Sequence, residues 1–300
     1  MKLLANSQLL RIFCLLGLFL ISVFKCNVIF SQKTNAVAYH DLSSQILDTN
    51  VNYAIYYSPN SAKADSIDII YLFHGVGGDH TTWNERYDAF KLLDSLHNVN
   101  NLKPFIAIAP QAFNTYYIND INNSFPYYSF FIKEFIPKTD SIIRCNYKIR
   151  NRTVCGLSMG GYGAAIFAFK EPDLFHTCIV LSGAIRTELD LMLLSDNAYK
   201  KYYQPILGPA SSPEKRITEF WKSYSPYHII NGELTSKLKN VHWYVDCGAN
   251  DYLYSPNLSF HKLLRSYNIP HEFHVRHGKH EWEFMMNGFV NAIFYWNGLP

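Results

Sequence analysis

The sequence lacks the marks of several protein classes. Its 300 residues include only 6 cysteines, and none of them lies in a CxxC pair or in a cluster with the spacing of metal ligands. Internal repeats and low-complexity tracts are also absent. Since 48% of the residues are hydrophobic, the chain can bury a large single core, and disorder is not expected beyond the N-terminus.

An excess of positive charge is missing once the N-terminus is set aside. The formal net charge is +3, and Lys2, Arg11 and Lys25 are the only charged residues among the first 31. The remaining chain is therefore neutral overall. It carries no basic stripe, so we expect no nucleic-acid partner.

Long hydrophobic runs occur only at the start. Residues 12–24 form an apolar run that follows Lys2 and Arg11 and is short for a membrane span. We interpret residues 1–31 as a secretory signal peptide and residues 32–300 as a secreted or periplasmic chain, with no stable membrane span once the signal is cleaved. An uncleaved N-terminal membrane anchor is the alternative. A lipoprotein linked through Cys26 is disfavoured, because Phe24 and Lys25 stand where small residues are expected.

Four cysteines remain after such a cleavage. Cys155, Cys178 and Cys247 fall in expected core strands, where buried thiols without a disulfide are the simpler interpretation. A disulfide through Cys145 stays open in an oxidising compartment.

The rest of the chain alternates between strand-like and helix-like segments. Strands are expected at 52–57, 67–73, 105–109, 151–155, 178–182, 241–247 and 272–276. Helices are expected at 87–96, 130–141, 161–169, 256–267 and 281–294, with a kink at Pro137. Continuous apolar strands such as 178–182 are typical of a parallel sheet buried on both faces. The pattern predicts one α/β domain over residues 32–300, with a mostly parallel twisted sheet and helices on both faces.

Residues 187–240 interrupt the alternation of strand-like and helix-like segments. We interpret them as an insertion or partial cap before the last two strands, although an ordinary surface elaboration fits as well.

The most informative motif is a sharp turn with a serine at its apex. Gly156-Leu157-Ser158-Met159-Gly160 lies between an expected strand and an expected helix, the context of the nucleophile elbow of a serine hydrolase. The turn is so tight that side chains two positions before and after Ser158 would collide with neighbouring chain, which explains both glycines.

A serine hydroxyl is a poor nucleophile and needs a base and an acid that orients this base. His280 is the expected base, since it follows the strand 272–276 and precedes the last helix; His274 and His277 are its rivals. Asp251 is the expected acid, in the loop after the strand 241–247, and Asp246 is its rival.

No metal or other cofactor is expected. His271, His274, His277 and His280 are spaced by three residues, a pattern that suggests a metal site. A strand, however, points alternate residues to opposite faces, so zinc is improbable.

The negative charge that develops during ester hydrolysis needs preorganised donors. The expected oxyanion hole consists of the backbone N–H groups of Met159 and of Val76, the latter in the glycine-rich loop 74–78. This loop lacks the lysine pattern of a phosphate-binding loop. Tyr116, Tyr117 and Trp221 are candidates for substrate binding, and core packing explains them equally well.

Taken together, the motifs resemble the esterase D family of α/β hydrolases. The resemblance rests on four segments and spans nearly the whole mature chain: His74-Gly75-Val76-Gly77-Gly78, Gly156-Leu157-Ser158-Met159-Gly160-Gly161-Tyr162-Gly163, Cys247-Gly248-Ala249-Asn250-Asp251 and Gly278-Lys279-His280-Glu281-Trp282. It implies an α/β-hydrolase fold, a triad of Ser158, Asp251 and His280, and oxyanion donors at Val76 and Met159.

The family resemblance leaves the substrate open, because the family includes feruloyl, acetylxylan and tributyrin-type esterases, S-formylglutathione hydrolases and mycolyltransferases. We expect an exported serine carboxylesterase that forms an acyl-enzyme and acts on acylated carbohydrate (feruloyl or acetyl esters) or on small acyl esters. One alternative is an acyltransferase with the same triad. A thioesterase similar to S-formylglutathione hydrolase is a second, which a secretory signal disfavours, and an inactive carbohydrate-binding protein is the third.

Overall fold

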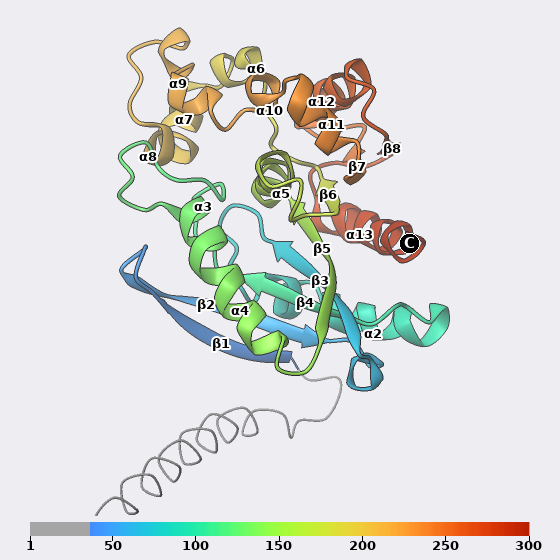
Figure 1. The fold of residues 1–300 in the computed structure, drawn as a ribbon. Helices are drawn as coiled ribbons and strands as arrows, with labels where there is room; N and C mark the ends of the chain where they lie inside the picture. The colour runs from blue at the N-terminus through green and yellow to red at the C-terminus, as the bar shows by residue number, and fades with distance from the viewer. Residues whose placement is uncertain (1–36, 300) are drawn as a thin grey trace, which may run out of the picture.

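The computed structural model describes residues 37–299 as an α/β fold around one eight-stranded sheet (Figure 1). The expected signal peptide, residues 1–31, lies outside the described residues. The strand order is β1-β2-β4-β3-β5-β6-β7-β8. The strands are β1 (Val37–Ser44), β2 (Thr49–Tyr57), β3 (Ser66–Phe73), β4 (Phe105–Pro110), β5 (Lys148–Leu157), β6 (Thr177–Leu181), β7 (His242–Gly248) and β8 (His271–Arg276).

Strands β3 to β8 run parallel, whereas β2 is antiparallel to both β4 and β1. The expected mostly parallel sheet is therefore confirmed. Strand β1 was not predicted; its burial pattern leaves most of its side chains at least partly exposed, so it carries little of the apolar signal of a core strand. It covers the edge of β2.

The helices surround the sheet and fill the segments between strands. They are η1 (Ser61–Lys63), η2 (Thr82–Arg86), α2 (Ala89–Asn100), α3 (Tyr127–Phe130), η3 (Phe131–Phe135), α4 (Ile136–Ile143), α5 (Met159–Lys170), α6 (Glu188–Met192), α7 (Asp196–Tyr202), α8 (Gln204–Leu207), η4 (Glu214–Arg216), α9 (Glu219–Lys222), α10 (Pro226–Ile229), α11 (Gly232–Leu238), α12 (Tyr254–Ser266) and α13 (Trp282–Asn297).

Two buried apolar clusters cover the two faces of the sheet. One face packs against α2 and α13, through side chains such as Phe90 and Phe289. The other packs against α3 to α5 and α12, with Phe131, Phe167 and Phe260 among its members. Both faces of the parallel strands are thus removed from water, as the continuous apolar runs predict.

The segment expected as one kinked helix at 130–141 is a longer helical run over residues 127–143. Its middle, η3, is one turn of π-helix, and Pro137 follows in the first turn of α4. Proline lacks an N–H and cannot donate to a carbonyl in the preceding turn, so the helix widens just before it. The observed distortion lies where the sequence predicted the kink.

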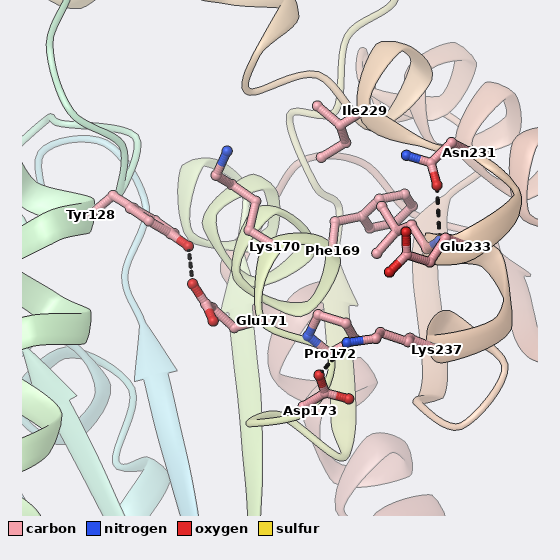
Figure 2. A pocket seen from close by; sticks show the side chains of 11 residues that line it. Tyr128, Phe169, Lys170, Glu171, Pro172, Asp173, Ile229, Asn231, Glu233 and Lys237 are labelled. Atoms are coloured by element: carbon pink, nitrogen blue, oxygen red, sulfur yellow. Dashed lines mark hydrogen bonds and ion pairs between the residues drawn. The ribbon is translucent and has the colours of Figure 1, made fainter.

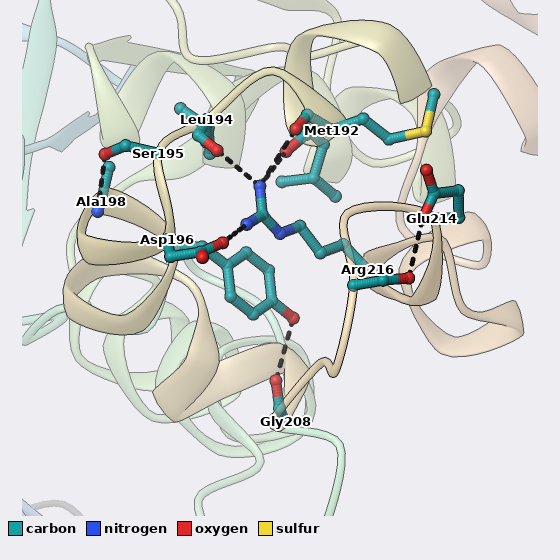
Figure 3. A network of polar contacts seen from close by, with 11 residues as sticks. Met192, Leu194, Ser195, Asp196, Ala198, Gly208, Glu214 and Arg216 are labelled. Carbon is teal, nitrogen blue, oxygen red and sulfur yellow. Dashed lines mark hydrogen bonds and ion pairs between the residues drawn. The ribbon is translucent and has the colours of Figure 1, made fainter.

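The segment 187–240 consists of the short helices α6 to α11 and lies at one end of the molecule, beyond the carboxyl ends of the central strands (Figure 1). Its anchor is Arg216, of which only 2% is exposed. The Arg216 guanidinium donates to the carbonyls of Leu191 and Met192 at the end of α6, to that of Leu194 just after it, and to Asp196 at the start of α7 (Figure 3).

Candidate active site

Ser158 occupies the turn between β5 and α5. Its backbone has φ 55° and ψ −115°, a conformation outside the usual regions for a residue with a side chain. A Cβ added at Gly156 would lie 2.1 Å from the carbonyl oxygen of Gly160, and a Cβ at Gly160 would lie 2.2 Å from the oxygen of Phe73. Both glycines are therefore required by backbone contacts, as the sequence predicted.

Three side chains from distant parts of the chain meet at this turn. His280 Nε2 lies 3.0 Å from Ser158 Oγ. Its Nδ1 lies 3.0 and 2.9 Å from the two carboxylate oxygens of Asp251. This places the imidazole between a hydroxyl and a carboxylate, the arrangement that allows it to remove the hydroxyl proton while Asp251 holds the ring.

Hydrogen bonds between two loops fix the acid and the base relative to each other. The loop after β7 carries Asp251 and the loop after β8 carries His280, and the Asn250 N–H donates to the Gly278 carbonyl at 3.0 Å. Burial of Asp251 opposes its ionisation, but hydrogen bonds from His280 and the Leu253 N–H outweigh it and hold the pKa of Asp251 below its ordinary range. Asp251 is thus a buried carboxylate ready to stabilise a cationic imidazole.

The rival residues have other partners. Asp246 forms a bidentate ion pair with Arg276 at 2.8 Å, which occupies its carboxylate inside the sheet. His274 lies 2.7 Å from Glu272 and stacks on Tyr244. His277 is exposed, and neither it nor His274 is hydrogen-bonded to Ser158.

The histidines spaced by three residues do not converge. His271 contacts His261 of α12, whereas His274 packs against Tyr244 on the other side of the sheet. Within residues 37–299, no group of three His, Cys, Asp or Glu side chains has the arrangement of a metal site.

The loop after β3 lies beside Ser158, and hydrogen bonds of the buried His74 side chain stabilise it. Gly75 and Val76 line the same cleft as Ser158. His74 Nε2 accepts a hydrogen bond from the Ala112 N–H at 3.0 Å, and its Nδ1 lies 2.8 Å from the Gly75 carbonyl. Burial lowers the pKa of His74 to about 4, so the imidazole is neutral and donates through Nδ1.

The second expected oxyanion donor, Met159, is the first residue of α5. Helix geometry leaves its N–H without an acceptor in the helix, at the positive end of the helix dipole. Developing negative charge next to Ser158 would be stabilised there.

A cleft of about 610 Å³ opens above Ser158 and His280. The side chain of Tyr252 lies over the imidazole of His280, with ring centroids 4.5 Å apart. The insertion contributes Leu194, Ala198, Tyr202 and Tyr203 to the lining of this cleft, and α13 contributes Trp282 and Met285.

The three aromatic candidates differ in position. Tyr116 lines the cleft, at 6% exposure. Tyr117 does not: it is fully buried, stacks on Phe73 at 4.2 Å and donates to the His74 carbonyl, so the expectation of a substrate contact is corrected to a core position beside the loop 74–78. Trp221 is buried in a small adjoining hollow that also borders Tyr116, and it does not line the cleft itself.

Sequence reasoning missed Arg186 and Tyr252, which both line the cleft. Tyr252 directly follows Asp251 in the sequence, and this adjacency could have predicted its position beside Asp251 and His280. Arg186 follows β6, another strand whose carboxyl end faces this edge of the sheet, and carries a charge in an otherwise apolar segment.

A second hollow lies on another part of the surface, between the end of α5 and α11 (Figure 2). Several of its polar side chains already have partners: Tyr128 donates to Glu171, and Lys237 pairs with Asp173. The triad residues do not line it. Among the described residues, no helix combines the length and apolar character that crossing a membrane requires.

Comparison with known proteins relates the chain to esterases. Residues 44–293 match the family model described as putative esterase. The chain is 26% identical to an acetyl esterase of Caldicellulosiruptor saccharolyticus over 245 residues, which cover 78% of this chain and 84% of the relative. It is 28% identical over 155 residues to an endo-1,4-beta-xylanase/feruloyl esterase of Xylanibacter ruminicola, covering 51% of this chain but only 21% of that protein.

The solved structures share the fold. A ferulic acid esterase structure superposes with a TM-score of 0.70 at 23% identity, covering 89% of this chain and 98% of the other. The expected α/β-hydrolase fold is thereby confirmed. The matched family segment contains every residue of the Ser158, Asp251 and His280 cluster.

Proposed function

This chain belongs to the putative esterase family and is an esterase, and we propose that it is an exported serine carboxylesterase that works through an acyl-enzyme. The resemblance read from the sequence motifs is confirmed at the level of the family. The observation that carries the proposal is the hydrogen-bonded series Ser158–His280–Asp251 at a nucleophile elbow.

Acylation follows from this geometry. Ser158 Oγ attacks the ester carbonyl carbon while His280 Nε2 takes the hydroxyl proton, and the N–H groups of Val76 and Met159 stabilise the oxyanion. Asp251 keeps the Nδ1–H of His280 oriented and stabilises the imidazolium. The imidazolium then gives its proton to the departing alcohol as the carbon–oxygen bond breaks, which leaves the acyl group on Ser158.

Deacylation repeats these steps with water. His280 removes a proton from a water molecule, the resulting hydroxide attacks the acyl carbon, and the second oxyanion is stabilised by the same two N–H groups. Its collapse releases the carboxylic acid, and the proton on His280 returns to Ser158. No metal or cofactor takes part in this proposal.

We further propose that the substrate is acylated carbohydrate, with feruloyl or acetyl groups, or a small acyl ester. Support comes from the printed names of the relatives, an acetyl esterase and a xylanase/feruloyl esterase. The rings of Tyr116, Tyr202, Tyr203 and Trp282 in the cleft suit a sugar or a phenolic acyl group. The segment 187–240 would act as a partial cap, since it contributes to the lining of this cleft.

Export is proposed from residues 1–31, which have the composition of a signal peptide and lie outside the described residues. The chain would then act in the periplasm or outside the cell, where polysaccharide esters are accessible.

The test is hydrolysis of p-nitrophenyl acetate, p-nitrophenyl butyrate, methyl ferulate and acetylated xylan by the wild-type chain and by Ser158→Ala. We expect the substitution to lower kcat/KM by about 10⁴-fold or more, because both chemical steps pass through Oγ. Ser266→Ala, which removes a hydroxyl at the end of α12, is the matched control and should keep wild-type rates. Turnover that survives in Ser158→Ala would refute the assignment, and hydrolysis of ferulate or xylan ester would identify the substrate class.

A further inference from the structure

Arg186 is a cation in the wall of the catalytic cleft. It lies in the loop between β6 and α6 and lines the cleft together with Ser158, and it also borders the adjoining hollow of Tyr116 and Trp221. The Ala184 N–H donates to the carbonyl of Ser158 at 3.0 Å, so the backbone of Arg186 is only two residues from a direct contact with the nucleophile. At about 3.5 Å per residue, its Cα lies within about 7 Å of that contact.

The guanidinium of Arg186 has a neutral partner. Its Nε donates to Tyr203 Oη at 2.8 Å, with its Cζ 5.9 Å from the centre of the tyrosine ring. Among residues 37–299, no carboxylate lies within 4.0 Å of it. Asp190, the acid that influences Arg186 over a longer distance, already accepts hydrogen bonds from the Thr187 N–H and hydroxyl in the N-terminal cap of α6.

Other arginines withdrawn from the surface each meet a carboxylate. Arg276 pairs with Asp246, Arg152 pairs with Asp140, and Arg216 pairs with Asp196. A partly desolvated charge is costly unless an opposite charge or several hydrogen bonds compensate it. A guanidinium has five donors, and Tyr203 takes one of them. The remaining donors form a planar fork that matches the two oxygens of a carboxylate.

We propose that Arg186 binds a carboxylate of the substrate, so that the preferred esters of this enzyme carry a free acid group besides the ester bond. The inference rests on the proposed function, because it requires Ser158 to be the reacting group. Tyr203 fixes the guanidinium through Nε, while Tyr116 and Tyr252 provide apolar surface for the part of the substrate between the ester and the acid. The carboxylate could belong to the acyl group, as in a half-ester of a dicarboxylic acid, or to the alcohol, as in an acylated hydroxy acid.

Two pairs of esters separate these sources. The first pair is p-nitrophenyl hydrogen succinate and its methyl ester, which differ by an anion on the acyl side. The second pair is 4-acetoxybenzoate and its methyl ester, which differ on the alcohol side. For each pair the readout is the ratio of kcat/KM for the anion to kcat/KM for the neutral ester, measured for the wild-type chain, Arg186→Gln, Arg186→Lys and Lys91→Gln.

In Arg186→Gln we expect this ratio to fall about tenfold or more in one pair, the size of a lost charge-assisted hydrogen bond. The pair in which it falls locates the carboxylate on the acyl or the alcohol side. Arg186→Lys should keep part of the ratio, because it retains the charge without the fork. Lys91→Gln removes one positive charge from the exposed side of α2 and should leave both ratios unchanged.

The proposal is overturned if neither ratio changes in Arg186→Gln. Equal losses of kcat/KM for the anion and the neutral ester would leave the ratio unchanged and would indicate a merely structural arginine. Should Arg186→Gln not fold, the wild-type chain still decides, since its kcat/KM for the anion must exceed that for the neutral ester in one pair. Ser158→Ala is assayed on all four esters. Turnover in that variant would reject the proposed function, whereas serine-dependent turnover with an unchanged ratio would reject only the role of Arg186.

Discussion

At the scale of single residues, the glycines around the nucleophile give the sharpest prediction. A Cβ at Gly160 would lie 2.2 Å from the oxygen and 2.6 Å from the carbonyl carbon of Phe73, and backbone atoms inside a sheet cannot move aside easily. Gly160→Ala is therefore expected to lower the free energy of unfolding by about 2–3 kcal/mol and kcat/KM by about 100-fold. Urea unfolding and p-nitrophenyl acetate kinetics would measure both.

The control for this substitution is Gly232→Ala, at the start of α11, where an added Cβ has no heavy atom within 4 Å. It should leave activity unchanged. Equal losses in the two variants would show that the effect belongs to glycine replacement in general rather than to the elbow.

His74 supplies a pH-dependent prediction. Its pKa in the folded chain is about 4, owing first to burial, and the ordinary value in the unfolded chain is about 6.5. The unfolded chain binds a proton at His74 more tightly than the folded chain does. The contribution of the neutral His74 to the free energy of unfolding is therefore complete above pH 6.5 and is lost as the pH falls from 6.5 to 4. Between pH 7 and pH 5 this amounts to about 2 kcal/mol.

We therefore expect the free energy of unfolding of the wild-type chain to fall by about 2 kcal/mol more than that of His74→Gln when the pH is lowered from 7 to 5. Denaturant unfolding of both proteins at the two pH values measures this difference. Other titrating groups are common to both proteins and cancel in this difference. Parallel pH dependences would contradict a neutral, buried His74 at the start of the loop 74–78.

The positions of site residues were predictable from sequence where chemistry and backbone geometry coincide, and unpredictable where packing decides. Ser158, His280 and Asp251 each follow a strand and bear the side chain that ester hydrolysis needs, and the structure brings all three together. Tyr117 and Tyr116 are adjacent in sequence, yet one supports the core and the other lines the cleft. Both residues have positive φ, so the loop is not a regular strand in which successive side chains point to opposite faces. The direction of each side chain could therefore not be inferred from the sequence.

At the scale of elements, apolar periodicity identified the central strands and the long helices, while the short pieces of the insertion escaped it. Helices α6 to α10 have at most 7 residues each, too few for a hydrophobic repeat to emerge. Their positions depend instead on local caps and on the buried contacts of Arg216. No pattern in the sequence indicates that this one arginine joins α6 to α7.

The insertion is accordingly expected to depend on Arg216. Arg216→Met removes three hydrogen bonds to carbonyls at the end of α6 and just after it, and leaves those carbonyls without the guanidinium, at a cost of about 2–4 kcal/mol. Leu194, Ala198 and Tyr202 belong to this region and line the cleft, whereas the triad lies on other elements. We expect KM for p-nitrophenyl butyrate to rise several-fold and kcat to change less.

Lys215→Met is the matched control, since its side chain is exposed next to Arg216 in the same short helix. Limited proteolysis would be expected to cut residues 187–240 in Arg216→Met sooner than in the control. A fall in kcat with KM unchanged would instead mean that Arg216 acts on the triad and would reject its role as an anchor of the cleft wall.

At the scale of the whole molecule, the site is a consequence of topology. Strands β3, β5, β7 and β8 run parallel, so the loops after them meet at one edge of the sheet and bring residues 76, 158, 251 and 280 together. Strand order reverses beside β3, because β4 lies on one side of it and β5 on the other, and binding sites in such sheets form at this point. Periodicity predicts the strands but not their order, which depends on how the chain crosses over between them.

The proposed signal peptide gives a prediction for export. Residues 1–31 have the composition of a cleavable signal and precede β1, so a chain that starts at Gln32 should keep the Tm and kcat/KM of the full-length protein. Removing residues 1–44 should not, because β1 pairs with β2 along its whole length and Ser44 bonds Glu134 in the helical run. The exposed edge of β2 would lower Tm and favour aggregation.

Expression in a secreting host then separates a cleaved signal from an anchor. A cleaved signal predicts soluble protein with an intact mass that corresponds to a start near Gln32, and with serine-dependent activity outside the cytoplasm. Full-length mass in the membrane fraction would support the anchor instead. Either result leaves the chemistry at Ser158 untouched, because every proposed participant from Val76 to His280 lies beyond β1, but only cleavage releases the enzyme toward soluble polysaccharide.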